Sequence, residues 1–206
     1  MDNFSKTDST EEKILEAAKK VFLKKGMYGA RMQEIADEAG INKALLHYYF
    51  RSKDKLFESI FEEAFQEFVP KAFNVLRSEI PFEEKIAGFV SNYIDMVLEN
   101  PFMPIFIINE INQNPERMIP ITRLMQVLKE SVFKEMQEKA QSGVYRNVDP
   151  LQLFSSIISM TLFPFLARPL IQGAFGYDDH QFRNFIEERK RLVPDIVLTY
   201  LKSVSS

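Results

Sequence analysis

The sequence predicts an all-α fold with a small N-terminal head and a larger helical body. Apolar side chains recur at helical spacing along nearly every long segment, as at Ile14, Ala17 and Val21. No run alternates apolar and polar residues between hairpin turns, so no sheet is expected. Glycine is rare, and Gly26 and Gly40 follow segments of helical periodicity, where they would end a helix.

The N-terminal part predicts three helices and the start of a fourth. We expect the first to begin at Ser9, with Glu12 completing a capping box, and to end at Gly26. Asn42 and Ser52 have side chains that can cap a helix, so we expect the third helix to begin at Asn42 and the fourth helix to begin at Ser52. The second covers 32–39, and the fourth continues towards residue 68 before a break at Pro70.

The body predicts further helices whose boundaries fall at prolines and glycines. Pro164 and Pro194 lie within the last two and should kink them. A loop with Gly173 and Gly176 separates these two helices. The expected ranges are 81–99, a short segment after Pro101, 115–141, 149–171 and 179–204.

The amino-acid composition excludes several kinds of functional site. The 206 residues include no cysteine, which excludes disulfides, thiolate metal sites and cysteine nucleophiles. The net charge is -3, but residues 1–55 hold 11 basic and 9 acidic residues, a balance of +2. Four cations, Lys43, Arg51, Lys53 and Lys55, gather around the third helix with only Asp54 among them, and such a basic edge suits phosphate binding.

Targeting features are absent from the N-terminal segment. Residues 1–13 are polar and charged, unlike a signal peptide. The longest nearly apolar run, 157–167, is well short of the ~20 residues that span a bilayer. We therefore expect a cytoplasmic protein without membrane association.

The segment 32–53 predicts two helices around a tight turn. Gly40 can adopt the left-handed conformation that this turn needs, and Ala39 allows the helices to approach closely. The expected internal face consists of Ile35, Ala36, Ile41, Leu46 and Phe50. The opposite face would carry Lys43, Ala44, Leu45, His47 and Tyr48, which include donors for phosphates and bases and an Ala44 methyl for thymine.

These residues resemble the head of the tetracycline-repressor (TetR-like) transcription regulators. The resemblance lies in Ile35-Ala36, Ala39-Gly40-Ile41-Asn42, Leu46, His47-Tyr48-Tyr49-Phe50 and Lys53-Leu56-Phe57, within residues 10–60. It implies a DNA-binding domain over 1–55 and a ligand-binding and dimerisation domain over 56–206. An apolar Leu45 is unusual on a surface that faces DNA.

The resemblance also implies positions that contact double-stranded DNA: Arg31, Gln33, Asn42, Lys43, Ala44, His47, Tyr48, Tyr49 and Lys53. The alternative is that the aromatic residues belong to an ordinary core and the lysines to a solvated face. Three adjacent aromatic residues in one helix cannot all face the same core, which favours DNA binding. Paired heads about 34 to 36 Å apart would then bind a palindromic operator.

Dimerisation is implied by the last two helices, which form a four-helix interface in TetR-like proteins. The residues concerned are Leu151, Phe154, Ile158, Leu162, Phe165, Phe182, Phe185, Ile186, Val193, Ile196, Val197 and Leu201. The alternative is that these apolar stripes close the core of each monomer.

The middle helices are rich in aromatic and methionine side chains, which suit a pocket for an apolar or aromatic small molecule as well as a plain core. The candidates are Phe61, Phe65, Phe89, Tyr93, Met96, Met103, Phe106, Met125, Phe133 and Met136. With the resemblance, they predict a homodimeric repressor that such an effector releases from DNA, with no cofactor.

Other functions fit less well. The two histidines, His47 and His180, lie far apart, and neighbouring glutamates diverge by about 100° on a helix, which argues against an enzyme. Asp178 and Gln181 have the spacing of a capping box, which we prefer to a metal site with His180. A helical dimeric scaffold that binds protein remains an alternative.

Overall fold

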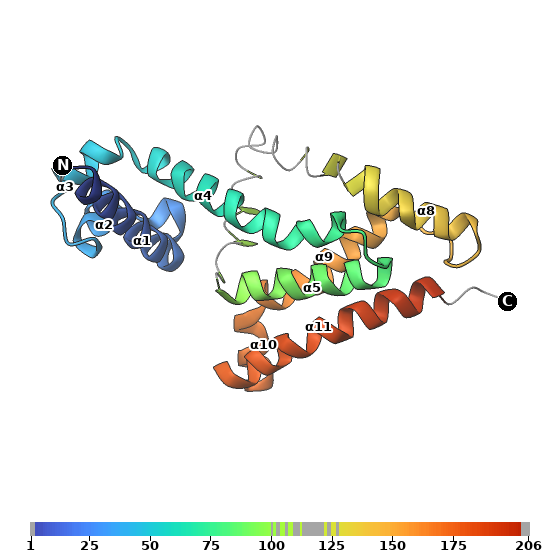
Figure 1. Cartoon of the computed structure of the whole chain (residues 1–206). Coiled ribbons are helices and arrows are strands. Elements are labelled where there is room, and N and C mark those ends of the chain that lie inside the picture. The colour runs from blue at the N-terminus through green and yellow to red at the C-terminus, as the bar shows by residue number, and fades with distance from the viewer. Residues whose placement is uncertain are drawn as a thin grey trace. The chain divides into compact units, whose positions relative to one another are not determined.

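The computed structural model describes residues 3–99, 101, 104–105, 107–108, 112, 122, 125–126 and 128–202. Every regular element in these residues is helical, which confirms the predicted fold class (Figure 1). The chain forms two compact units, Met1–Glu67 and Phe68–Ser206, and the division falls inside α4 (Lys53–Phe73). The functional division expected between residues 55 and 56 stays a prediction.

The first unit holds α1 (Asn3–Gly29), α2 (Met32–Glu38), α3 (Lys43–Tyr49) and the first part of α4. The predicted first helix was wrong at both ends, since Ser9 and Gly26 lie inside α1. Nothing in residues 3–8 stops a helix, because they contain no proline or glycine. An internal glycine costs a helix only about 1 kcal/mol, which tertiary packing can offset.

The core of this unit forms between α1, α2, α3 and the start of α4. The rings of Phe22 and Phe57 meet edge to face, with centroids 5.4 Å apart. The predicted face of α1 is buried, and so are most of the predicted internal residues of the turn unit, Ile41 being half-buried. The buried residues are Ile14, Ala17, Ala18, Val21, Phe22, Ile35, Ala36, Leu46, Phe50, Leu56, Phe57 and Ile60.

The turn between α2 and α3 has the predicted left-handed glycine, because Gly40 has a φ of 66°. Its N–H donates to the Asp37 carbonyl, and the Ile41 N–H donates to the Ala36 carbonyl at 3.0 Å. These bonds satisfy carbonyls that the end of α2 would otherwise leave free. Asn42 caps α3 as predicted, since its side-chain oxygen accepts from the Leu45 N–H at 2.8 Å.

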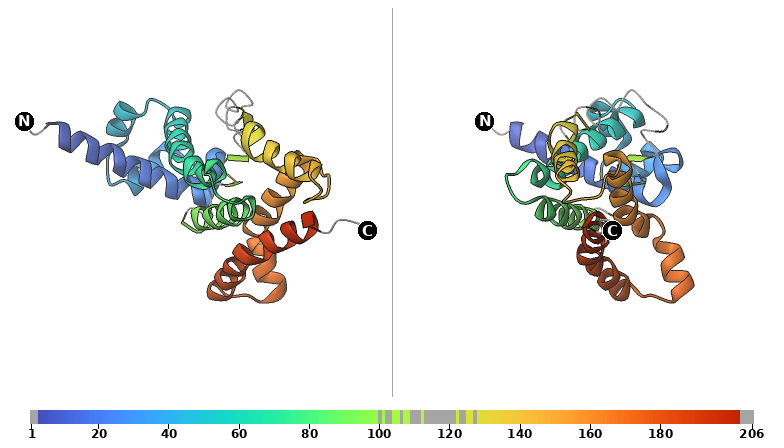
Figure 2. Two further views of the ribbon diagram at one scale, coloured as in Figure 1. Left: turned by 45° about the vertical axis from the view of Figure 1, so that its right-hand side comes forward. Right: turned by 90° about the vertical axis from the view of Figure 1, so that its right-hand side faces the viewer.

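The second unit is a bundle in which α5 (Phe82–Glu99) and α11 (Asp179–Lys202) lie side by side and α9 (Pro150–Leu166) packs on both (Figures 1 and 2). A short turn, η1 (Asn74–Arg77), precedes α5. A π-helical turn, η3 (Lys129–Phe133), leads into α8 (Lys134–Gln141). The expected helix after Pro101 and the first part of 115–141 lie largely outside the described residues.

Prolines interrupt the helices less than predicted. Pro70 lies inside α4, so the break expected there was wrong. Pro164 lies inside α9, which ends at Leu166, and α10 (Arg168–Phe175) follows at an angle of 63°. The single helix expected over 149–171 was therefore wrong, while α11 passes through Pro194.

Within the described part of the chain, no single helix has the length and apolarity to cross a membrane. The bent pair α9 and α10 meets that criterion of length and composition only when the two helices are taken together.

A polar clasp joins the end of α11 to the start of α5. The buried Tyr145 hydroxyl donates to Glu83 Oε1 at 2.8 Å, and Lys202 Nζ lies 3.2 Å from the same oxygen. The hydrogen bond from Tyr145 is the main cause that lowers the pKa of Glu83 to about 2 although desolvation opposes this, and a backbone N–H and Lys202 lower it further. Desolvation first, and then Glu83, raises the pKa of Tyr145.

Candidate nucleic-acid interface

Helix α3 has one face in the core and one face in solvent. Leu46 and Phe50 are buried at 0% and 6% exposure, whereas Tyr48 is 78% exposed. At about 100° per residue, Ala44 and Tyr48 point away from Leu46 and Phe50. The exposed residues of α3 are Lys43, Ala44, Leu45, His47 and Tyr48, and Tyr49 is half-buried. We name these six residues the α3 face.

Local hydrogen bonds fix the ends of α3. The Asn42 cap uses the side chain that was also predicted to contact DNA. His47 Nδ1 lies 3.3 Å from the Arg51 carbonyl, which orients the imidazole along the chain that leaves α3. The rings of Tyr48 and Tyr49 meet edge to face with centroids 5.5 Å apart. The α3 face is therefore held by contacts within the head.

The start of α2 lies on the same unit and carries Arg31 and Gln33, both exposed. Glu34 accepts from the Arg31 backbone N–H at 3.3 Å and pairs with Lys25 at 2.8 Å. The Lys25 contact is the largest cause of the lowered pKa of Glu34. Gln33 donates to Asp37 at 2.8 Å. The Arg31 side chain thus extends from a helix end whose carboxylate is already paired.

The four cations predicted around α3 differ in their surroundings. Lys43 and Arg51 are exposed and form no ion pair with any described residue. Lys55 pairs with Glu58 at 2.6 Å. Lys53 is half-buried and donates to the Ala30 carbonyl at 3.2 Å. This contact ties α4 to the junction of α1 and α2, a structural role that the sequence pattern did not reveal.

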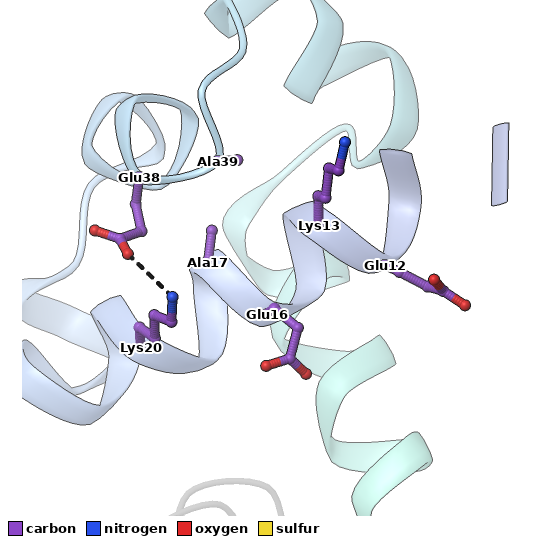
Figure 3. A pocket seen from close by; sticks show the side chains of 7 residues that line it. All are labelled: Glu12, Lys13, Glu16, Ala17, Lys20, Glu38 and Ala39. Carbon is purple, nitrogen blue, oxygen red and sulfur yellow. Dashed lines mark ion pairs between the residues drawn. The ribbon is translucent and has the colours of Figure 1, made fainter. Parts of the chain in front are cut away.

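A hollow of about 410 Å³ lies between α1 and α2 (Figure 3). Its lining is mostly charged: Glu12, Lys13, Glu16, Lys20 and Glu38, with Ala17 and Ala39. Lys20 and Glu38 form an ion pair of 3.5 Å across it. Charged walls of both signs fit a hydrated surface groove and not a site for an apolar molecule.

The predicted dimer residues separate into three groups by burial. Leu151 and Ile196 are exposed, at 61% and 46%, and Phe154, Ile158 and Phe185 are half-buried. The remaining seven are buried within the chain itself: Leu162, Phe165, Phe182, Ile186, Val193, Val197 and Leu201. Those seven pack α9 and α11 into the body, as the alternative interpretation expected.

A solvent-facing groove of about 330 Å³ lies between α9 and α11. Its lining residues are Val148, Gln152, Leu153, Ser156, Met160, Ile196, Val197 and Tyr200. Leu192, Ile196 and Tyr200 form an exposed stripe at helical spacing on α11. Apolar helical spacing did not identify Gln152, Ser156 and Tyr200 as lining residues of this groove, because each of these side chains carries a polar group.

The predicted ligand residues are only partly within the described side chains. Those of Phe61, Phe65, Met103 and Phe106 lie outside them. Phe89, Met96 and Met136 are buried, and Tyr93, Met125 and Phe133 are half-buried. In the second unit, five rings, Phe73, Phe89, Tyr93, Phe133 and Phe154, form successive contacts with centroids 5.0 to 6.4 Å apart. We name these five the ring cluster.

Two members of the ring cluster stand out. Phe154, which was also predicted for a dimer interface, contacts Phe73, Phe89 and Phe133 within the chain. Tyr93 is half-buried as a residue, but desolvation of its hydroxyl raises the pKa to about 12. No described residue forms a hydrogen bond with that hydroxyl. A desolvated donor without a partner carries an energetic cost that a bound acceptor would remove.

The acidic segment before α11 is a helix cap. Asp178 accepts from the Gln181 N–H at 2.8 Å, and Gln181 accepts from the Asp178 N–H at 2.9 Å. This confirms the predicted capping box. His180 is exposed and lies 3.4 Å from the Asn184 amide. Among the described residues, no three His, Asp or Glu side chains gather as a metal would need.

The chain therefore has an N-terminal helix-turn-helix head and a helical C-terminal body. Residues 14–60 match the family "Bacterial regulatory proteins, tetR family". The repressor NicS of Pseudomonas putida is 44% identical over 61 residues, which cover 30% of this chain and 29% of NicS. The probable regulator YttP of Bacillus subtilis is 24% identical over 198 residues, or 93% of this chain and 95% of YttP.

Solved structures agree with these sequence relationships. A mutant of HlyIIR, whose wild type is a hemolysin II transcriptional regulator, is similar with a TM-score of 0.65 and 25% identity, covering 96% of this chain and 100% of that chain. Residues 14–60 therefore match the N-terminal domain of this family, and the chain as a whole is similar to TetR-like transcriptional regulators. These relatives are regulators and not enzymes, in agreement with the sequence interpretation.

Proposed function

We propose that this protein is a cytoplasmic homodimeric repressor that binds a palindromic DNA operator through the α3 face and leaves it when a small apolar or aromatic molecule binds the body. One observation carries the DNA-binding part of this proposal. A seven-residue helix, capped and anchored on its buried side, presents Lys43, His47 and Tyr48 to solvent. Solvent-facing cations and hydrogen-bond donors on such a helix suit phosphates and base edges in a major groove.

Lys43 and Arg51 support phosphate binding because neither has an anionic partner among the described residues. Arg31, at the start of α2, adds a third exposed cation on the same unit. Each phosphate contact releases counterions and so strengthens binding at low salt. We assign a supporting role to Lys53, because its ammonium already donates to Ala30.

Dimerisation is proposed through the exposed side of α9 and α11. Leu151, Ile196 and Tyr200 are exposed apolar side chains on these two helices, and the groove between the helices widens the available surface. Apolar side chains that remain exposed in the monomer favour burial against a second copy. Two heads held in this way could bind two half-sites about one DNA turn apart.

Effector binding is proposed at the ring cluster. Aromatic rings offer a large apolar surface with defined stacking geometry, and Tyr93 offers a donor that no described residue engages. Such a site suits an aromatic or apolar molecule that carries a hydrogen-bond acceptor. An effector that prefers one arrangement of the body would alter DNA affinity by a coupling of about 1 to 3 kcal/mol.

The test is selection of duplexes from a random pool by the purified chain, followed by titration of the enriched duplex in a gel shift. We expect enrichment of a two-fold symmetric sequence. Tyr48→Ala should weaken binding to that duplex at least ten-fold, whereas Tyr177→Ala, a change of the same type in the body, should leave it unchanged. No enrichment over random duplex would exclude the repressor and favour the protein-binding scaffold.

A further inference from the structure

We infer that Leu45 contacts the methyl group of a thymine in the major groove and so fixes one base of each half-site. The inference rests on the proposed DNA-binding function and adds to it a specificity-determining residue. It starts from an apolar side chain at 37% exposure on a helix face whose other side chains are either small, as in Ala44, or carry a polar group.

The position of Leu45 follows from the helix geometry. Leu46, the next residue, is fully buried, and Leu45 therefore projects about 100° away from it. Ala44 and Tyr48 occupy the centre of the exposed face, and Leu45 flanks them on one side while His47 flanks them on the other. In addition, the Leu45 N–H donates to the Asn42 cap, which holds this residue in the first turn of α3.

The chemistry of the groove selects the target. Leucine has no donor or acceptor, so it cannot read a base edge by hydrogen bonding. Thymine is the base that presents a methyl group in the major groove, and apolar side chains recognise it by contact with that methyl. Ala44 is too small to cover Leu45, and so a thymine methyl can approach the Leu45 side chain.

The alternative to a DNA contact is that Leu45 is an isolated surface leucine without a function, which is common in proteins. Two features argue against it. Leu45 lies in the first turn of α3, the part of a recognition helix that contacts base edges. Its neighbours on that face include both Lys43 and His47, whose polar groups would bring phosphates and bases close.

The experiment replaces each thymine of the selected duplex, one at a time, by deoxyuridine, which lacks only the methyl group. Dissociation constants are measured for the wild type, Leu45→Ala and Leu170→Ala. The last is a control of the same type, since Leu170 is 64% exposed on α10. Circular dichroism and thermal melting establish that each variant is folded.

We expect one thymine per half-site at which uracil weakens wild-type binding about four-fold, the effect of one buried methyl or methylene group. Leu170→Ala should show the same four-fold weakening, whereas Leu45→Ala should bind thymine and uracil duplexes equally. A wild type insensitive to every substitution would overturn the inference without affecting DNA binding. A uracil effect that persists in Leu45→Ala would also overturn it, because another residue would then contact the methyl.

Selection that enriches no duplex would be a different failure. It would remove the proposed repressor function and this inference with it, whereas an enriched duplex without methyl dependence removes the inference alone. If Leu45→Ala does not fold, Leu45→Gln replaces the apolar side chain by a polar one of similar size. The weakening caused by uracil should then be lost, and an unchanged weakening would count against Leu45.

Discussion

Arg189 donates two hydrogen bonds to the Met160 carbonyl, from Nε at 3.1 Å and from Nη2 at 2.6 Å. In a regular helix the N–H four residues further on would bond this carbonyl, but that residue is Pro164. The guanidinium therefore replaces the donor that proline lacks. Burial lowers the pKa of Arg189, yet an arginine stays cationic at neutral pH.

This relationship predicts a coupling between residues 164 and 189. Arg189→Ala should lower the free energy of unfolding by about 1 to 3 kcal/mol, because it leaves a carbonyl without a donor. In a Pro164→Ala background, the new N–H can bond Met160, and the same arginine change should cost less. Urea unfolding of the two single variants and the double variant measures the coupling. Strictly additive effects would contradict the proposed compensation.

Two tyrosines should respond oppositely to removal of their hydroxyl groups. Tyr93→Phe removes a desolvated donor that has no described partner, and we expect it to leave the free energy of unfolding unchanged or raise it by about 1 kcal/mol. Tyr145→Phe removes the bond to Glu83 and should lower that free energy by about 1.5 to 3 kcal/mol. Denaturant unfolding of the two variants compares them directly. Equal destabilisation would show that Tyr93 has a partner.

The clasp at Glu83 predicts an acid-sensitive contribution to stability. Its pKa is lowered from 4.5 to about 2 in the folded chain, so the folded state favours the carboxylate. The stabilisation is complete above about pH 4.5 and disappears as the pH falls towards 2. Glu83→Gln should flatten the pH dependence of unfolding in that window. Glu99→Gln, at the other end of α5, serves as the control.

Salt dependence should distinguish the lysines of the two units. Lys43→Ala removes one proposed phosphate interaction per protomer, and the slope of log affinity against log salt should become shallower by about 1 for each phosphate that is no longer bound. Lys134→Ala changes a comparably exposed lysine on α8. It should leave the slope unchanged. If both variants keep the wild-type slope, Lys43 does not contact phosphate.

A charge on the exposed side of α11 should separate the proposed dimer. Ile196 is 46% exposed in the single chain, so Ile196→Arg should not disturb the monomer fold. Burying that charge at an interface would be unfavourable without a partner, and we expect sedimentation to give a monomer at micromolar concentration. Val144→Arg, in the loop after α8, should behave as the wild type. An unchanged dimer for Ile196→Arg would move the interface elsewhere.

Local sequence rules predicted turns and helix caps well. The Gly40 turn, the Asn42 cap and the Asp178–Gln181 capping box depend on backbone groups within a few residues, and they were confirmed. The break expected at Pro70 was wrong, and so were the start of the first helix at Ser9 and its end at Gly26. Pro164 illustrates the reason, since the donor that compensates for it comes from Arg189, a residue in another helix.

Helical periodicity identified apolar residues but not what covers them. Leu162 and Val197 are buried inside the chain, while Leu151 and Ile196 on the same two helices remain exposed. Phe154 contacts rings from α4, α5 and η3, which no spacing along α9 could indicate. Assigning a side chain to core, pocket or interface requires the tertiary neighbours of that side chain.

Helix α3 spans seven residues, about two turns, and is held by the Asn42 cap, by buried Leu46 and Phe50, and by the Lys53 contact beyond its end. Isolated helices shorter than about 12 residues are marginal in water. A synthetic peptide of residues 42–53 should therefore be largely unstructured in solution. Grafting that sequence onto an unrelated scaffold would transfer its side chains without the geometry that aligns them.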